Sequence, residues 1–260
     1  MHVLSINNIS FSYDLRVPTL RDLSLDIQKG EFLGVIGPNG SGKTTLLRLL
    51  DRIFVPHKGT ILLGGRDISS YPRSEIAKRI AFLPQENNPQ FPFTVLEMVL
   101  MGRSPHIPGM SFENSHDRTI AFDSMKLTDV QHLADHPITA LSGGERQRVF
   151  IARALAQEPE VILLDEPNAH LDITHQIDVM AIMKKLNRET GLTVVSVSHD
   201  LNLAAAYSDR VAILVCGTLT AVGTPHEVLT EERIRETFHT QVFVDRHPLG
   251  NAVRITPVMT

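Results

Sequence analysis

A glycine-rich segment that ends in lysine and threonine carries the most specific chemistry in this sequence. Residues 37–44 read Gly-Pro-Asn-Gly-Ser-Gly-Lys-Thr and fit the pattern G-x-x-x-x-G-K-[ST]. The glycines let backbone N–H groups turn toward phosphate oxygens, Lys43 neutralises the β and γ phosphates, and the Thr44 hydroxyl can ligate Mg²⁺. The segment follows the apolar run Phe32–Ile36 and precedes the helical pattern Thr45–Asp51, as the pattern requires. It predicts a nucleotide-phosphate site made by Gly37, Pro38, Asn39, Gly40, Ser41, Gly42, Lys43, Thr44 and Thr45.

Two adjacent carboxylates follow another apolar run, because Asp165 and Glu166 come directly after Val161–Leu164. At the carboxyl end of a strand they would emerge on the edge where open α/β sheets bind ligands. There Asp165 could hold Mg²⁺ through its water shell, and Glu166 could act as the general base for an attacking water. An acidic pair at a strand end is by itself more often only solvated. The phosphate-binding segment makes the catalytic interpretation the better one.

Polar side chains follow two further predicted strands. Gln85 comes after Ile80–Leu83 and Pro84, and His199 comes after Val194–Ser198. Taken alone, each would usually be an ordinary loop residue. Since the carboxyl ends of parallel strands meet at one edge, we expect both to join the same site.

A helix is predicted to start at Ser142, where the sequence reads Leu-Ser-Gly-Gly-Glu over residues 141–145. The Ser142 hydroxyl would cap the helix, with Glu145 reaching back three residues later. Gly143 and Gly144 would leave the N–H groups of the first turn uncovered, and an uncovered helix N-terminus is an anion site. An ordinary capped helix is the alternative interpretation of these residues.

Alternating strands and helices must position these groups. The nearly unbroken apolar runs Ile80–Leu83, Val161–Leu164 and Thr193–Val197 are typical of strands buried on both faces of a parallel sheet. The start of the chain, with Val3–Ile9 and Leu23–Ile27, is expected to be rich in β structure. The fold class predicted is therefore α/β: a P-loop core with a parallel sheet, an antiparallel β portion at the N-terminal side, and an inserted α-helical subdomain.

The helical insertion is predicted because no convincing strand occurs between Phe91 and Pro159. Capping-box spacings that begin at Thr94, Thr128 and Ser142 mark three helix starts in this region. Residues 87–158 are accordingly assigned to a helical subdomain, and residues 1–86 and 159–260 to the nucleotide-binding core. The stretch Asn87–Pro92 is expected to be the linker between them.

The composition is that of an ordinary soluble globular chain, with 260 residues, 42% hydrophobic and 21% charged. The formal charge of −4 gives no net field to attract nucleic acid or an anionic membrane, so no nucleic acid partner is expected. The single cysteine, Cys216, excludes an internal disulfide and is expected to be a small buried residue beside the strand Val211–Val215.

No secretory signal is evident at the N-terminus, so the protein is expected to stay in the cytoplasm. The longest apolar-rich stretch, Phe91–Met101, is far shorter than the roughly 20 residues that cross a bilayer. Any role at a membrane would then need a partner.

The motifs together resemble the ATP-binding cassette (ABC) family in their order and separation, over nearly the whole chain. Residues 141–147 are similar to the signature that separates this family from other P-loop NTPases. The resemblance implies that ATP and Mg²⁺ lie between two cassettes arranged head to tail. Ser142, Gly143 and Gly144 of one chain would then close on the γ-phosphate held by the P-loop of the other.

The same resemblance assigns further roles. Gln85 would connect Mg²⁺ and the attacking water with the membrane subunit, which gives Thr44, Gln85 and Asp165 as the metal set. His199 would hold the γ-phosphate and orient Glu166. Tyr13 would stack on adenine, although packing of a strand aromatic on its neighbours stays an alternative. The sequence departs from the family at Asn168, Ala169 and His170, where Thr or Ser commonly precedes the Leu-Asp pair.

A narrower resemblance links Met101–His106 to importers of ferric siderophores, haem and cobalamin. The tail resembles them in Gly223–Pro225, Glu227–Thr230, Asp245–Pro248 and Ile255–Pro257, with a strand-rich cap as the alternative interpretation. The narrower resemblance implies ATP-driven uptake of such a metal chelate by a dimer at the cytoplasmic face of the inner membrane. Integral membrane permease subunits would be direct partners, and a periplasmic or lipid-anchored binding protein an indirect one. The segment Gly102–His106 is expected to help form the groove for a permease helix, with a helix-ending loop as the alternative.

Other functions are less consistent with the sequence. A soluble cassette protein of DNA repair or translation would be expected to carry a long coiled-coil insertion or a second cassette. A GTPase or kinase is disfavoured because no guanine-recognition motif accompanies the signature. An ATP sensor without turnover is disfavoured by the intact Glu166 and His199.

Overall fold

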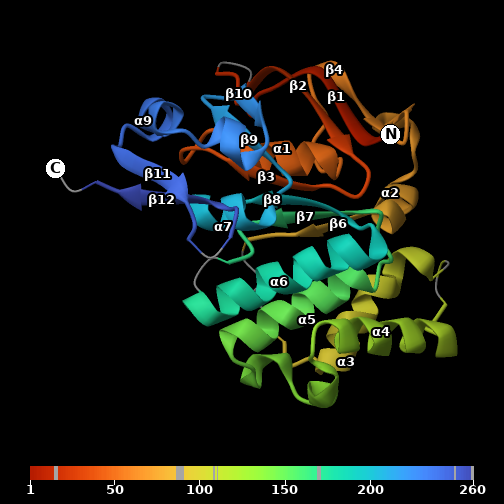
Figure 1. Ribbon diagram of the computed structural model, residues 1–260. Helices are drawn as coiled ribbons and strands as arrows, with labels where there is room; N and C mark the ends of the chain where they lie inside the picture. The colour runs from red at the N-terminus through yellow and green to blue at the C-terminus, as the bar shows by residue number, and fades with distance from the viewer. Residues whose placement is uncertain are drawn as a thin grey trace.

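The computed structural model describes residues 1–14, 17–85, 91–107, 109, 111–168, 171–248 and 250–258. A six-stranded sheet forms its centre (Figure 1), from β3 (Phe32–Ile36), β6 (Ile80–Leu83), β7 (Val161–Asp165), β8 (Thr193–Val197), β9 (Arg210–Val215) and β10 (Thr218–Gly223). The strand order is β10-β9-β3-β8-β7-β6, and only the β9–β10 pairing is antiparallel. Every residue of β3, β7 and β8 is buried, because layers cover both faces of the sheet. The predicted parallel sheet is confirmed.

A smaller antiparallel sheet covers one face, as predicted for the N-terminal portion. It consists of β1 (His2–Phe11), β2 (Leu20–Gln28), β4 (Lys58–Leu63) and β5 (Arg66–Asp67), in the order β2-β1-β4-β5. In β2, Leu23, Leu25 and Ile27 are buried while the residues between them are exposed, which is the period of a strand with one covered face. Helix α1 (Lys43–Leu50) lies between the two sheets (Figure 1) and contributes its leucines to their shared core.

Helices cover the opposite face of the large sheet (Figure 1): α3 (Val95–Leu100), α4 (Ser115–Leu127), α5 (Gly143–Leu155) and α6 (Ile173–Thr190), with the 3₁₀ turns η2 (Met101–His106), η3 (Gln131–Leu133) and η4 (Ile138–Ala140). Their apolar faces form one core with Phe32, Ile162 and Val194 of the sheet. The predicted helical insertion is therefore present. The predicted linker residues 87–90 lie outside the described residues.

Two of the three predicted capping boxes form, and one does not. At both Thr94 and Ser142 the hydroxyl accepts from the backbone N–H three residues on, and the following glutamate accepts from the capping residue. The prediction for Thr128 is wrong, because α4 already starts at its own Asn114 cap and runs as far as Leu127. Thr128 ends that helix, and its hydroxyl donates to the Ser124 carbonyl at 3.3 Å.

The C-terminal part packs at the β9 and β10 side of the large sheet. It contains the helices α7 (Leu201–Tyr207), α8 (Pro225–Val228) and α9 (Glu231–Phe238), and the hairpin of β11 (Val242–Arg246) and β12 (Val253–Pro257). Elsewhere in the chain, the short helices η1 (Ile68–Ser70) and α2 (Arg73–Arg79) precede β6. The prediction that Cys216 is buried is wrong. Cys216 and Gly217 form the tight turn between β9 and β10 with φ of 46° and 80°, and such a turn directs its side chains outward.

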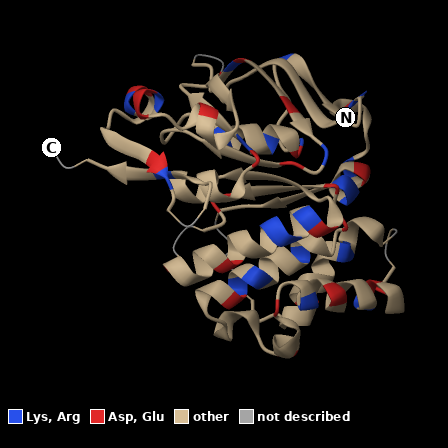
Figure 2. Ribbon diagram, viewed as in Figure 1, with Lys and Arg blue, Asp and Glu red and all other residues tan. Residues whose placement is uncertain are grey.

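Acidic and basic residues are interspersed along the helical layer (Figure 2), in keeping with the near balance of charge in the sequence. Among the residues that the structure describes, no helix combines the length and the apolar character needed to cross a membrane.

Candidate nucleotide-binding and catalytic site

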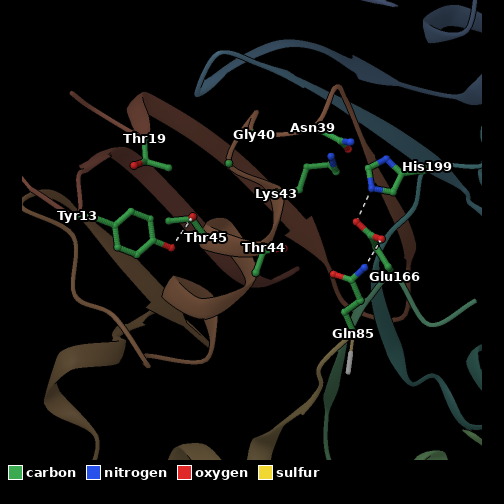
Figure 3. A pocket seen from close by; sticks show the side chains of 11 residues that line it. Tyr13, Thr19, Asn39, Gly40, Lys43, Thr44, Thr45, Gln85, Glu166 and His199 are labelled. Carbon is green, nitrogen blue, oxygen red and sulfur yellow. Dashed lines mark hydrogen bonds and ion pairs between the residues drawn. The ribbon is translucent and has the colours of Figure 1, made fainter. Parts of the chain in front are cut away.

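Four neighbouring strands bring the predicted site residues to one edge of the sheet. The parallel strands β3, β8, β7 and β6 lie side by side, and the P-loop, His199, the Asp165–Glu166 pair and Gln85 follow their respective carboxyl ends. A cavity of about 850 Å³ opens at this edge (Figure 3). It is lined by Tyr13, Thr19, Asn39, Gly40, Gly42, Lys43, Thr44, Thr45, Gln85, Glu166 and His199.

The P-loop turns Lys43 into this cavity. Its Nζ donates to the carbonyls of Gly37 at 2.9 Å and Pro38 at 3.0 Å, which leaves one of its three N–H groups for a ligand. Burial lowers the pKa of Lys43, while Glu166 and Asp165 act in the opposite direction. Glycine is required at position 37, where φ is 152° and a Cβ atom would lie 2.0 Å from the Leu214 carbonyl oxygen.

Ser41 adds a buried hydroxyl to the loop. Its Oγ is buried and has no hydrogen-bond partner among the described residues, although the Ser41 carbonyl accepts from the N–H of Gly217 at 3.1 Å. A buried polar atom without a partner is costly, so this hydroxyl fits a loop that completes its hydrogen bonds on an anionic ligand.

Thr44, Asp165 and Gln85 bring oxygen atoms suited to binding Mg²⁺ to the P-loop end of the cavity. The Thr44 hydroxyl donates to Asp165 Oδ1 at 2.9 Å, and the amide oxygen of Gln85 points to the Thr44 side of the cavity (Figure 3). Burial raises the pKa of the Asp165 carboxyl, which the Thr44 hydrogen bond opposes and Glu166 reinforces. Hydroxyl, carboxylate and amide oxygens are the ligands that a hard cation takes, so these residues fit Mg²⁺. No group of three or more His, Cys, Asp or Glu side chains that could hold a metal ion by themselves occurs in the described part of the chain.

The carboxylate of Glu166 is held from two sides (Figure 3). Gln85 Nε2 donates to its Oε2 at 2.9 Å, and His199 Nε2 contacts its Oε1. The backbone of Glu166 has a φ of 50°, and its N–H donates to the Val197 carbonyl at 3.1 Å. The predicted general base therefore points into the cavity in a fixed orientation, with His199 beside it as predicted.

Tyr13 lies just after β1 and lines the cavity with 59% of its surface exposed. Its hydroxyl is 3.0 Å from Thr45 Oγ1, and its ring meets Phe11 and Phe54 edge to face, with centroids 5.2 and 5.5 Å apart. The ring thus packs on neighbours and is also accessible from the cavity. Stacking on adenine stays a prediction.

Sequence reasoning missed Thr19, which lines the cavity beside Tyr13 (Figure 3). The Thr19 N–H donates to the Phe11 carbonyl at 2.8 Å, where β2 begins to pair with β1. No motif marks this residue. Only the pairing of two strands places it at the site.

The signature residues do not line this cavity. Ser142 and Gly143 are exposed at the start of α5, although the Ser142 N–H donates to Glu145 Oε2 at 2.8 Å within the capping box. Gly144 is buried, and a Cβ atom there would lie 2.5 Å from the His175 ring. Within one chain, the structure keeps these residues apart from the P-loop.

The segment Met101–His106 makes several contacts within the chain. Arg103 is 2% exposed and pairs with Asp117 at 3.0 Å and Glu158 at 2.8 Å. A Cβ atom at Gly102 would lie 2.1 Å from the Arg153 carbonyl, and His106 Nε2 is 2.9 Å from the Gln157 carbonyl. The side chain of Arg103 therefore joins this 3₁₀ turn to α4 and to the end of α5, and a groove for a permease helix at Gly102–His106 stays a prediction.

Comparison with known proteins gives a consistent set of relatives. Residues 20–169 match the sequence profile of the ABC transporter family. The hemin import ATP-binding protein HmuV of Gloeobacter violaceus is 45% identical, over 92% of this chain and 88% of its own. The iron(3+)-hydroxamate import ATP-binding protein FhuC of Bacillus subtilis is 40% identical, over 96% and 93%.

Solved structures extend this likeness to the fold. A metal-chelate type ABC transporter in an inward-facing conformation superposes with a TM-score of 0.87 at 33% identity, covering 100% of this chain and 98% of that chain. A dimeric ATP-binding cassette in a post-hydrolysis state, bound to ADP and phosphate, superposes with a TM-score of 0.75 at 32% identity, covering 85% and 98%.

Proposed function

The chain belongs to the ABC transporter family of ATP-binding proteins, and we propose that it is the ATP-hydrolysing subunit of an importer for a metal chelate. The observation that carries the ATPase function is the Glu166 carboxylate, held by Gln85 and His199 at the mouth of the P-loop cavity. The cargo class is that of the relatives: iron hydroxamate or another ferric siderophore, haem, or cobalamin.

Each group at the cavity has a part in hydrolysis. The free N–H of Lys43 and the P-loop amides bind the β and γ phosphates, and Tyr13 faces the base. Glu166 accepts the proton of the water that attacks the γ phosphorus, while His199 and Gln85 keep its carboxylate aimed at that water. Thr44, Asp165 and Gln85 would hold Mg²⁺, which neutralises charge on the phosphates when bound. The products are ADP and phosphate.

A second copy of the chain is proposed to complete the site. Ser142 and Gly143 are exposed and do not line their own P-loop cavity, which suits a head-to-tail pair in which each signature closes on the partner's nucleotide. The dimeric cassette among the similar structures supports this arrangement. Integral membrane permease subunits would carry the pair on the cytoplasmic face of the membrane, with a substrate-binding protein acting on the far side.

The proposal is tested by separating nucleotide binding from hydrolysis. Lys43→Ala should weaken ATP binding severely in calorimetry, because it removes the charge that faces the phosphates. Glu166→Gln keeps size and hydrogen bonding, so ATP should still bind within a few-fold of wild type while phosphate release falls by a factor on the order of 10² or more.

Transport is tested in vesicles that contain the permease. The wild-type chain should drive accumulation of a labelled metal chelate, and Glu166→Gln should not. Full hydrolysis in Glu166→Gln would contradict the mechanism. Hydrolysis by the wild type without uptake of any of the three chelate classes would instead favour a soluble ABC ATPase without a transport role.

A further inference from the structure

The loop that follows the catalytic glutamate is tied to the signature helix of the same chain. Gln147, in the second turn of α5, donates its Nε2 hydrogen to the carbonyl of Pro167 at 2.9 Å. Pro167 is the residue directly after Glu166. The helix that presents Ser142 outward therefore holds the backbone next to the general base.

Packing around this hydrogen bond joins the same two parts. Gly144 is buried against the ring of His175, in the first turn of α6, and a Cβ atom at Gly143 would lie 3.6 Å from Leu171 Cδ2. The Leu171 carbonyl accepts from Gln176 Nε2 at 3.0 Å. The start of α5 thus rests on the end of the catalytic loop, and α6 supports both.

Backbone strain at Glu166 explains why such support is needed. A non-glycine residue with a φ of 50° lies in the left-handed region, which costs of order 1–3 kcal/mol and persists only where the surroundings fix it. Proline has a fixed φ and no N–H, so the orientation of its carbonyl is the remaining freedom at position 167. Gln147 fixes that carbonyl, and the Val197 carbonyl fixes the N–H of Glu166.

We propose that Gln147 is a positioning residue for Glu166, and that it makes hydrolysis in one chain depend on the placement of the same chain's signature helix. This inference rests on the proposed function, in which that helix closes on the partner's ATP. A nucleotide bound at one site of the pair would then set the general base of the other site through α5, Gln147 and Pro167.

The first test removes the donor and keeps the shape. Gln147→Met should lower kcat for ATP hydrolysis by about 5- to 10-fold, the effect of one lost hydrogen bond, with KM and ATP affinity unchanged. Gln131→Met, an exposed glutamine of the same helical layer, is the matched control and should behave as wild type. A kcat within about two-fold of wild type in Gln147→Met would overturn the proposal, as would an equal rise in KM.

A pH profile separates positioning from simple packing. Gln147→Glu cannot donate when the carboxylate is ionised, but it can donate to the Pro167 carbonyl when protonated. The ratio of its kcat to that of wild type should therefore rise as the pH is lowered from about 6.5 to about 4.5, the range in which a glutamate carboxyl of ordinary pKa begins to take up a proton. A ratio that does not change with pH would contradict the role of a donor at this position.

Mixed pairs of full-length chains show in which chain Gln147 acts. One chain carries Ser142→Arg and the other Lys43→Ala, so the single competent site uses the P-loop and Glu166 of the first chain with the signature of the second. Adding Gln147→Met to the first chain should slow hydrolysis, and adding it to the second should not. Slowing only from the second chain would overturn the proposal. If the unmodified pair has no activity, either the composite site of the proposed function fails or the empty second site leaves the signature helix of the first chain unplaced, and the unmixed Gln147 variants then decide the role of this residue.

Discussion

At the scale of single residues, burial acts on the two charged groups of the cavity in opposite senses. It lowers the pKa of Lys43 and raises that of Asp165, so that burial opposes the charge on each. Phosphate beside Lys43 and a cation beside Asp165 would each favour the charged form. Under the proposed function, nucleotide and Mg²⁺ therefore bind best together.

Asp51, at the end of α1, gives a pH-dependent prediction. Burial raises the pKa of its carboxyl from 3.8 to about 7, although Arg73 acts in the opposite direction. Because the folded state holds this proton more tightly, the contribution of Asp51 to stability is present at low pH and is lost as the pH rises from about 4 to about 7. Asp51→Asn removes this titration.

The variant should thus be more stable than wild type at pH 8, by more than about 1 kcal/mol or roughly 3 °C in Tm. Thermal unfolding followed by circular dichroism measures the difference. The gain should shrink when both proteins are measured at pH 5, and a gain that is equal at the two values would show that the carboxyl does not titrate in this range.

At the scale of elements, the 3₁₀ turn η2 is held in place by the ion pairs of Arg103, whose side chain is buried. The guanidinium of Arg103 donates hydrogen bonds to Asp117, Glu158 and the Ala156 carbonyl. Asp117 also caps α4, because it accepts a hydrogen bond from the Asn114 N–H at 3.1 Å. One arginine therefore joins η2, the start of α4 and the end of α5 into one body. The arginine of the segment Gly102–His106 is accounted for by this internal role.

Arg103→Met should lower the free energy of unfolding by about 3–5 kcal/mol, because it leaves the buried Asp117 carboxylate without its partner. Chemical denaturation measures this loss. The double variant Arg103→Met with Asp117→Asn should cost less than the sum of the single changes, since no unpaired charge is then buried. Normal stability together with lost transport would contradict this structural role and favour the groove for a permease helix at Gly102–His106.

At the scale of the whole molecule, the ATP site and the signature lie in different layers. The cavity opens where the large sheet meets the P-loop, whereas Ser142 begins a helix of the layer below the sheet (Figure 1). Under the proposed function, a single chain contacts the nucleotide only through its P-loop cavity, and the opposite side of the nucleotide is left without a signature. The proposed pair gives each nucleotide two contacts, and the γ-phosphate is the group that both chains share.

ATP should accordingly shift Glu166→Gln from monomer toward dimer on a sizing column, whereas ADP should not, because only ATP carries the shared phosphate. Adding Ser142→Arg should abolish the shift, since a large side chain at the start of α5 would block the partner's phosphate and leave its own P-loop intact. The permease can be included if the isolated chains associate too weakly. Dimers that form equally without nucleotide would contradict the shared site.

The sequence determined the features that depend on local pattern. The P-loop requires glycines at fixed positions before a helix, and buried parallel strands require unbroken apolar runs, so both could be predicted together with the groups that follow each strand. The capping boxes at Thr94 and Ser142 were predictable for the same reason, because all their hydrogen bonds lie within four residues.

The tertiary structure alone decided what depends on contacts between distant segments. Thr19 reaches the site through the pairing of β1 with β2, and Arg103 is buried by carboxylates 14 and 55 residues away. Thr128 ends a helix because α4 started earlier, and Cys216 is exposed because its turn bends outward. Gly144 and Gln147 meet α6 and Pro167 only after the helical layer has packed on the sheet, since no local pattern carries the identity of a neighbour that folding brings from elsewhere in the chain.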